Sequence, residues 1–203
     1  MTMKLYFSPS ACSLASNIVL NELGLPHELV KVDTRKKLTK AGEDFLAINP
    51  KGYVPALGLD DGSVLTEGPA ILQYLADQKP QAGLAPANGT MARYRLQEWL
   101  GYINSEVHKS FSTFFVPGTV DDEKKAAGER LAKKFDWLQA QLGARDTLMA
   151  EGFTVADAYL YTVLGWTAFV GIDLSRWPGL KAWHAKIGAR PAVVAALAAE
   201  KAA

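Results

Sequence analysis

The chain has 203 residues, of which 49% are hydrophobic and 21% are charged, and its formal net charge is +1. This is the composition of a globular protein with one large domain or two modest ones. The balanced charge gives no electrostatic basis for binding nucleic acid or an acidic membrane surface, so neither is expected as a partner. The one cysteine cannot form an internal disulfide, and no apolar run approaches the ~20 residues of a membrane span. We therefore expect a cytoplasmic protein without a signal peptide.

The first part of the chain, residues 1–79, mixes strand and helix signals. The predicted elements are a strand at Lys4–Phe7, a helix at Ser13–Glu22, a strand at Glu28–Val32, a loop with a short helix over Thr34–Ile48, strands at Val54–Leu59 and Ser63–Leu65, and a helix at Thr66–Asp77. Asp60-Asp61-Gly62 between the last two strands is a hairpin signature. A right-handed crossover makes the first two strands parallel, whereas the hairpin strands are antiparallel. The pattern predicts a small mixed sheet with helices packed against it.

The second part of the chain is predicted to be entirely helical. Residues 80–89 form the predicted linker, because Pro80, Gly83, Pro86 and Gly89 interrupt regular structure there. The predicted helices of residues 90–203 span about Thr90–Phe111, Val120–Gly143, Thr154–Val170 and Leu180–Gly188, with a shorter one after Pro191. We therefore expect an α/β domain at 1–79, a linker at 80–89 and an all-α domain at 90–203.

Cys12 lies where the first predicted strand turns into the first helix. Unpaired backbone N–H groups and the positive end of the helix dipole favour a thiolate there, which makes Cys12 a candidate nucleophile. The alternative is a small buried hydrophobic residue. Ser13-Leu14-Ala15 follows, so the second cysteine of a Cys-x-x-Cys pair is absent and thioredoxin-type dithiol exchange is excluded. A mixed disulfide with an external thiol needs only one protein sulfur and stays open.

Two further positions have the chemistry of a binding site. Val54-Pro55 opens a strand, and a cis peptide there would leave the Val54 backbone groups available to an extended peptide. The alternative is a simple edge-strand proline. Thr66-Glu67-Gly68-Pro69 starts a helix directly after a strand, where free backbone N–H groups suit a carboxylate while Glu67 suits an amine. The alternative for Glu67 is an acidic residue that only complements the helix dipole.

Three segments of the first domain, Tyr6–Ser13, Asn49–Leu57 and Leu65–Ile71, resemble those of bacterial glutathione S-transferases of the cysteine-type beta class. The resemblance continues through Trp99–Ile103, Ser105–Lys109 and Phe153–Tyr159, and so covers essentially the whole chain in order. It implies a thioredoxin-like N-terminal domain, an all-helical C-terminal domain and a homodimer. It also implies glutathione as co-substrate and no metal.

The resemblance further implies which residues bind glutathione. These are Cys12 at the sulfur, Lys37 at the glycyl carboxylate, Val54 at the cysteinyl backbone, Glu67 and Gly68 at the γ-glutamyl head, and Ser105, Glu106 and His108 from the second domain. Cys12 and His108 are the implied catalytic residues. Ser10 replaces a glycine common in the family, so we expect a small change in the turn. Gly101 stands where the family often has Asn, so we expect one polar contact to glutathione to be either missing or supplied by water.

The function that follows is conjugation of glutathione to a small electrophile, with glutathione-dependent mixed-disulfide chemistry at Cys12 in addition. One alternative is a non-catalytic binding or stress protein of the same fold, and another is a glutathione-dependent dehalogenase of a catabolic pathway. Thr154 and Asp157 match a helix capping box and are expected to serve folding alone.

Overall fold

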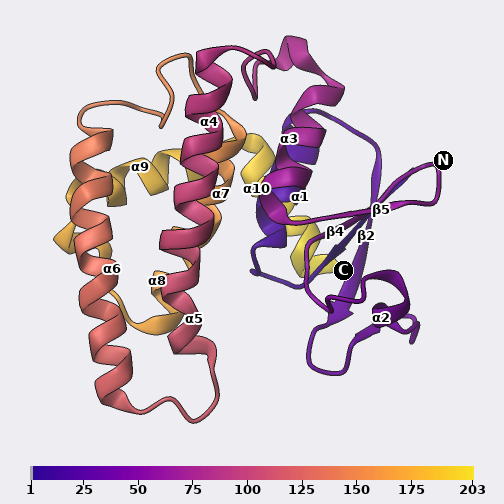
Figure 1. Ribbon diagram of the computed structural model, residues 1–203, viewed down its shortest axis with the longest axis horizontal. Helices are drawn as coiled ribbons and strands as arrows, with labels where there is room; N and C mark the ends of the chain where they lie inside the picture. Colours follow the sequence, from indigo (N-terminus) through magenta and orange to yellow (C-terminus); the bar gives the residue numbers. More distant parts are fainter. Residues whose placement is uncertain (1) are drawn as a thin grey trace. The chain divides into compact units, whose positions relative to one another are not determined.

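The computed structural model describes residues 2–203. Their contacts divide the chain into two compact units (Figure 1). The first unit comprises the chain up to Ala85 together with Ala189–Ala203, and the second comprises Pro86–Gly188. Among the described residues, no helix is both long and apolar enough to cross a membrane.

The first unit contains a five-stranded mixed sheet with the order β3-β2-β1-β4-β5. The strands are β1 (Met3–Phe7), β2 (His27–Asp33), β3 (Leu38–Thr39), β4 (Ala56–Gly58) and β5 (Val64–Thr66). β1 and β2 are parallel with Leu5 opposite Leu29, and β1 and β4 are antiparallel with Leu5 opposite Leu57. The parallel pair and the β4–β5 hairpin are confirmed, whereas β3 lies in the polar stretch that was expected to be a loop.

The helices of the first unit are α1 (Ser13–Glu22), α2 (Phe45–Ile48), α3 (Gly68–Gln78), a 3₁₀ turn at Pro80–Ala82 and α10 (Pro191–Ala202). They differ in how deeply they are buried: α1 is buried at every position from Ser13 to Leu20, whereas the short turn at Pro80–Ala82 has no buried residue. α1 has the predicted bounds. Ile18 of α1 and Leu72 of α3 are fully buried, as is Leu5 of β1. Each such side chain contributes about 1.5–3 kcal/mol through burial, so this core holds the turn before α1 in place.

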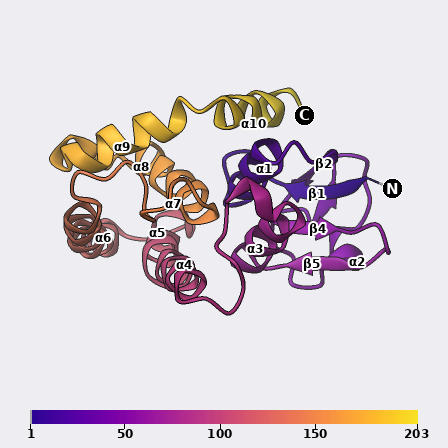
Figure 2. The ribbon, with the colours of Figure 1, turned by 90° about the horizontal axis from the view of Figure 1, so that it is seen from above.

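The C-terminal segment differs from the sequence-based prediction, which placed residues 90–203 in one domain. Residues 189–203 belong to the first unit, where α10 lies beside α1 (Figure 2). The Asn17 side chain donates to the carbonyl oxygen of Ala196 over 3.2 Å, and Arg190 pairs with Glu22 through two nitrogens at 2.6 and 3.1 Å. Val193 is fully buried. Helical periodicity alone says nothing about which unit such a face packs against.

The second unit is all helical, as predicted. Its elements are α4 (Met91–Tyr102), a π-helical segment (Ile103–His108), α5 (Lys109–Phe115), α6 (Asp121–Leu142), α7 (Val155–Gly165), α8 (Thr167–Val170), a 3₁₀ turn (Leu174–Arg176) and α9 (Pro178–Gly188). α5 and α6 run side by side (Figure 1), and α7 is buried over nearly its whole length.

The predicted continuous helix over Thr90–Phe111 is interrupted by the π-helical segment. Ile103 and Val107 are four residues apart and both fully buried, which is also the spacing of an α-helix. The hydrophobic pattern therefore contains no signal for the wider turn. Such turns occur frequently at functional sites, and this one contains three of the predicted site residues.

Candidate active site

Cys12 is the residue before α1 and lies at the end of the turn that follows β1. Its sulfur donates a hydrogen bond to the carbonyl oxygen of Val54, with 3.3 Å between the two atoms. The Val54–Pro55 peptide bond is cis, which is the geometry considered from the sequence. The fold thus brings together two predicted site residues that are 42 positions apart. The Val54 carbonyl, expected to be free, has the Cys12 thiol as its partner.

The ionisation of Cys12 differs from the expected thiolate. Burial raises the pKa of the Cys12 thiol to about 11, although hydrogen bonds from the backbone N–H groups of Cys12 and Ser13 act in the opposite direction. The nearby carboxylate of Glu67 raises the pKa further. The helix N-terminus therefore does stabilise the thiolate, but the loss of hydration outweighs it. At neutral pH Cys12 is a protonated hydrogen-bond donor.

This ionisation predicts how the free protein reacts with iodoacetamide. Because only the thiolate reacts, we expect the alkylation rate to rise about tenfold per pH unit above neutral pH. The rate should level off only near pH 11. Intact-mass kinetics measure this directly, since Cys12 is the one cysteine and Cys12→Ser gives the background. A plateau near neutral pH would show that the helix N-terminus dominates after all.

The turn before Cys12 is held by the C-terminal helix. Ser10 has a φ of 61°, in the left-handed region that favours the glycine it replaces. Its backbone N–H donates to Oε2 of Glu200 over 3.0 Å. Glu200 is only 3% exposed, and burial raises its pKa to about 7. Ser10 thus holds a backbone conformation that glycine adopts without strain.

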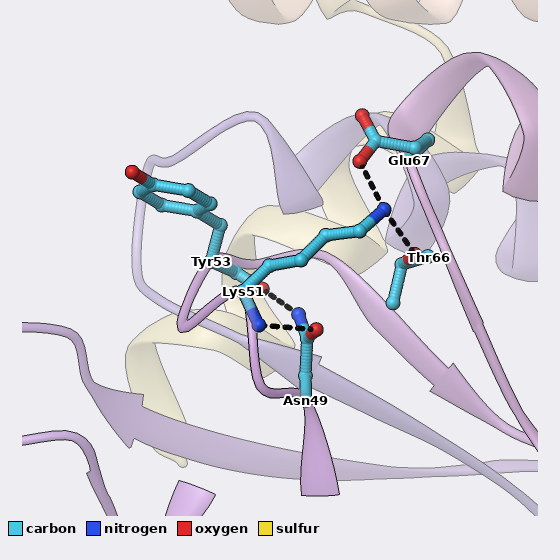
Figure 3. Close-up of polar contacts among 5 residues, drawn as sticks. All are labelled: Asn49, Lys51, Tyr53, Thr66 and Glu67. Atoms are coloured by element: carbon cyan, nitrogen blue, oxygen red, sulfur yellow. Dashed lines mark hydrogen bonds and ion pairs between the residues drawn. The ribbon is translucent and has the colours of Figure 1, made fainter. Parts of the chain in front are cut away.

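Glu67 lies directly before α3 and has an ammonium group as its partner (Figure 3). Nζ of Lys51 is 2.6 Å from a carboxylate oxygen of Glu67 and 3.0 Å from the hydroxyl of Thr66. The backbone N–H of Lys51 donates to the side-chain oxygen of Asn49, whose amide nitrogen donates to the Tyr53 carbonyl (Figure 3). The sequence predicts that Glu67 binds the amine of a ligand at the start of this helix. In the structure the side-chain ammonium of Lys51 takes that place.

Lys37 lies in the turn between β2 and β3. Its ammonium donates to the carbonyl oxygen of Gly52 over 2.8 Å and lies 5.6 Å from the centre of the Tyr53 ring. Gly52 has a φ of 69°, and a Cβ there would lie 3.3 Å from the Lys37 ammonium, so this position needs glycine. Two of the three ammonium protons are left for a carboxylate.

The second unit contributes the π-helical segment. Nδ1 of His108 is 2.7 Å from the Tyr159 hydroxyl, and Trp166 meets the imidazole edge-on with ring centres 4.7 Å apart. Burial, with a smaller effect of the Lys109 charge, lowers the pKa of His108 to about 4, so the ring is neutral at pH 7.

Ser105 and Glu106 lie on the same segment and are exposed. The Ser105 hydroxyl donates to the Gly101 carbonyl over 3.0 Å, and Glu106 pairs with Lys134 over 2.6 Å. The site residues therefore form two groups, one in each unit.

Sequence reasoning missed several polar partners of these residues. Lys51 lies in Asn49–Leu57, one of the segments that carry the family resemblance, and its positive charge next to a turn was the available signal. Asn104 and Glu200 had none, because their partners lie on distant segments. Tyr159 ends another segment that carries the family resemblance, but its contact with His108, 51 positions away, follows only from the fold. Among the described residues, no cluster of side chains could hold a metal ion.

Comparison with known proteins identifies the family. The family model "Glutathione S-transferase, N-terminal domain" matches residues 9–78, and "Glutathione S-transferase, C-terminal domain" matches residues 121–186. Glutathione S-transferase GstA of Escherichia coli is 44% identical over 198 residues, which covers 98% of each chain.

Solved structures agree with this match. A glutathione transferase from Methylococcus capsulatus has a TM-score of 0.97 and 52% identity, and all of both chains is covered. A sphingomonad glutathione S-transferase in complex with glutathione has a TM-score of 0.95 and 52% identity over 98% of this chain and 100% of that one. A beta-class enzyme from Sphingomonas chungbukensis has a TM-score of 0.95 and 49% identity over 97% and 98% of the two chains.

The chain belongs to the glutathione S-transferase family, with the thioredoxin-like and helical domains of that architecture. It is a glutathione transferase that uses glutathione as co-substrate.

Proposed function

We propose that this transferase conjugates glutathione to small electrophiles with Cys12 acting as a hydrogen-bond donor to the glutathione sulfur. The observation that carries the proposal is the hydrogen bond of 3.3 Å from the Cys12 sulfur to the Val54 carbonyl oxygen. Burial, which raises the pKa of the thiol to about 11, keeps this donor protonated at neutral pH. A donor at the sulfur stabilises the thiolate of glutathione, which is the attacking group in conjugation.

The groups at the ends of glutathione match the first unit. Glu67 suits the γ-glutamyl amine, the N–H groups at the start of α3 from Gly68 suit its carboxylate, and Lys37 suits the glycyl carboxylate. The backbone of Val54 suits the cysteinyl unit and brings its sulfur to Cys12. Lys51 occupies Glu67 in the free protein, so the ligand amine must compete with it.

We propose a role for the second unit in the same reaction. His108 is assigned to proton transfer at the glutathione sulfur, and Ser105 and Glu106 to polar contacts with the tripeptide. Support comes from their grouping on one π-helical segment and from the neutral state of His108, which a proton acceptor needs.

Mixed-disulfide exchange is a second proposed activity. The Cys12 thiolate attacks one sulfur of oxidised glutathione, a bond between Cys12 and a glutathionyl group forms as the original S–S bond breaks, and a glutathione thiolate leaves. A relative 29% identical to this chain is named a disulfide-bond oxidoreductase, which supports this chemistry. With a pKa of about 11 instead of the ordinary 9.0, the thiolate fraction falls about 100-fold and its nucleophilicity rises roughly tenfold. We therefore expect slow exchange.

Glutathione binding is tested with Glu67→Gln. We expect a loss of about 1.5–3 kcal/mol, which is a tenfold or greater rise in Kd by calorimetry, because one charged partner of the γ-glutamyl amine is removed. The fold should persist, since the Glu67 side chain is 63% exposed. Glu28→Gln is a matched control, because it breaks an exposed pair with Lys4 instead. Unchanged affinity in Glu67→Gln would leave Glu67 as a partner of Lys51 and of the α3 dipole, without a role in glutathione binding.

We further propose a homodimer located in the cytoplasm. The family resemblance and the composition support these assignments. Sedimentation at micromolar concentration should show a species of twice the 22.0 kDa chain mass, and a monomer alone would contradict the dimer.

The electrophile is open to screening, and aromatic halides are the first probes. Release of halide without a stable conjugate would indicate the dehalogenase alternative.

A further inference from the structure

His108 is one end of a chain of hydrogen bonds in the second unit. Its Nδ1 is 2.7 Å from the Tyr159 hydroxyl oxygen, and that hydroxyl donates to the side-chain oxygen of Asn104 over 2.9 Å. Asn104 and His108 are four residues apart on the π-helical segment, and Tyr159 comes from α7. Tyr159 is only 2% exposed, so water does not compete for these contacts.

The direction of these hydrogen bonds follows from the number of protons. A tyrosine hydroxyl has one hydrogen, and the amide oxygen of Asn104 can only accept, so the Tyr159 hydrogen is used there. The short contact between Tyr159 and Nδ1 of His108 therefore requires that Nδ1 carries the hydrogen and donates it. A neutral imidazole has one N–H, so Nε2 keeps a lone pair.

The ring is also fixed in orientation. Trp166 meets the imidazole of His108 at an interplanar angle of 75°, and the Tyr159 ring meets it at 80°. Contacts on two sides and a hydrogen bond at Nδ1 leave the ring little freedom to flip, so Nε2 keeps one direction.

We propose that Tyr159 and Asn104 are positioning residues that hold His108 in the tautomer with the proton on Nδ1, so that Nε2 accepts the thiol proton of glutathione. The S–H bond of glutathione breaks, its proton moves to Nε2, and the thiolate is left to attack the electrophile. The imidazolium is stabilised by the thiolate formed beside it and by its bond to Tyr159. The proton then passes to the leaving group or to water. This assignment rests on the proposed role of His108.

Nitrogen-15 NMR of the histidine rings tests the tautomer without any activity measurement. The chain has three histidines, and His108→Asn assigns the His108 signals by their loss. At pH 7 we expect Nδ1 of His108 to be protonated and Nε2 to be bare. Tyr159→Phe removes the acceptor, and Asn104→Ala frees the Tyr159 hydroxyl to donate to Nδ1. Both variants should therefore move the proton to Nε2.

Tyr161→Phe is a matched control on the same helix. Tyr161 stacks on His184, with ring centres 4.4 Å apart, so this variant should alter the His184 signals and leave the His108 tautomer unchanged.

Kinetics separate positioning from a structural role. We expect Tyr159→Phe and Asn104→Ala to lower kcat for conjugation about tenfold or more, with little change in the KM for glutathione, because base catalysis is lost while the binding groups stay. A wild-type His108 protonated on Nε2, or a tautomer unchanged in Tyr159→Phe, would overturn the inference. If the tautomer is as expected but His108→Asn keeps full activity, the proposed role of His108 fails instead.

Discussion

Cys12→Ala should lose glutathione-dependent disulfide reduction and keep measurable conjugating activity. Reduction through a mixed disulfide needs a protein sulfur, and the chain has no other cysteine. In conjugation the attacking sulfur belongs to glutathione, so the variant loses only one hydrogen-bond donor. A neutral hydrogen bond contributes about 0.5–1.5 kcal/mol, which corresponds to a two- to tenfold loss of conjugation. Reduction is measured with a mixed disulfide that contains a glutathionyl group, and conjugation is measured in parallel with an aromatic halide.

Cys12→Ser separates the donor from the nucleophile. A hydroxyl still donates to the glutathione sulfur but forms no disulfide, so this variant should conjugate faster than Cys12→Ala and reduce no disulfide. Mass spectrometry of the wild type with oxidised glutathione should show one added glutathionyl group, on Cys12. Full reductase activity in Cys12→Ala, or no covalent adduct in the wild type, would contradict a nucleophilic role of Cys12.

Asp157→Ala should be strongly destabilising. Asp157 is fully buried at the start of α7 and accepts from the backbone N–H of Leu148 at 2.8 Å and from the N–H and hydroxyl of Thr154 at 2.9 and 3.0 Å. Removal leaves these buried donors unsatisfied and deletes the helix cap. We expect the free energy of unfolding to fall by about 3–4 kcal/mol and the Tm by roughly 10 °C.

The pH dependence of stability gives a second measurement of Asp157. Burial raises its pKa from 3.8 to about 6, despite the hydrogen bonds that lower it. The folded protein thus binds the Asp157 proton more tightly than the unfolded chain does. The resulting contribution to the free energy of unfolding is fully present below pH 3.8 and is lost as the pH rises through about 6. Asp157→Ala should remove that part of the stability profile.

Asp173→Ala is the matched control for Asp157. Asp173 also accepts from a nearby backbone N–H, that of Ser175 at 2.8 Å, but it lies on the surface, where water replaces the lost bond. Asp173→Ala should therefore lower the free energy of unfolding much less than Asp157→Ala does. Equal losses in the two variants would mean that the burial of Asp157 does not matter.

Much of the fold was predictable from local patterns. Ser13–Glu22 was predicted with its observed bounds because a turn precedes it and Gly24 and Pro26 follow. The β4–β5 hairpin follows from Asp60-Asp61-Gly62, and the capping box of α7 from the spacing of Thr154 and Asp157. These features depend on residues within a few positions of one another, which is the range over which sequence patterns are informative.

The candidate site was predictable only in part. Cys12, Val54 and Glu67 were identified from turn and helix-start chemistry, and Lys37, Ser105, Glu106 and His108 from the family resemblance. Their polar partners were not, because Lys51 reaches Glu67 and Tyr159 reaches His108 across the folded chain.

Local sequence patterns were sufficient for most of the strands and helices in chain order, for the helix-start position of Cys12 and for the absence of a second redox cysteine. The packing of α10 in the first unit, the π-helical turn at residues 103–108 and the raised pKa of Cys12 follow instead from the folded chain. The physical reason is the same in each case. Burial and long-range packing set the hydration of a thiol, the partner of a helix face and the width of a turn, and these energies depend on residues that are distant in the chain.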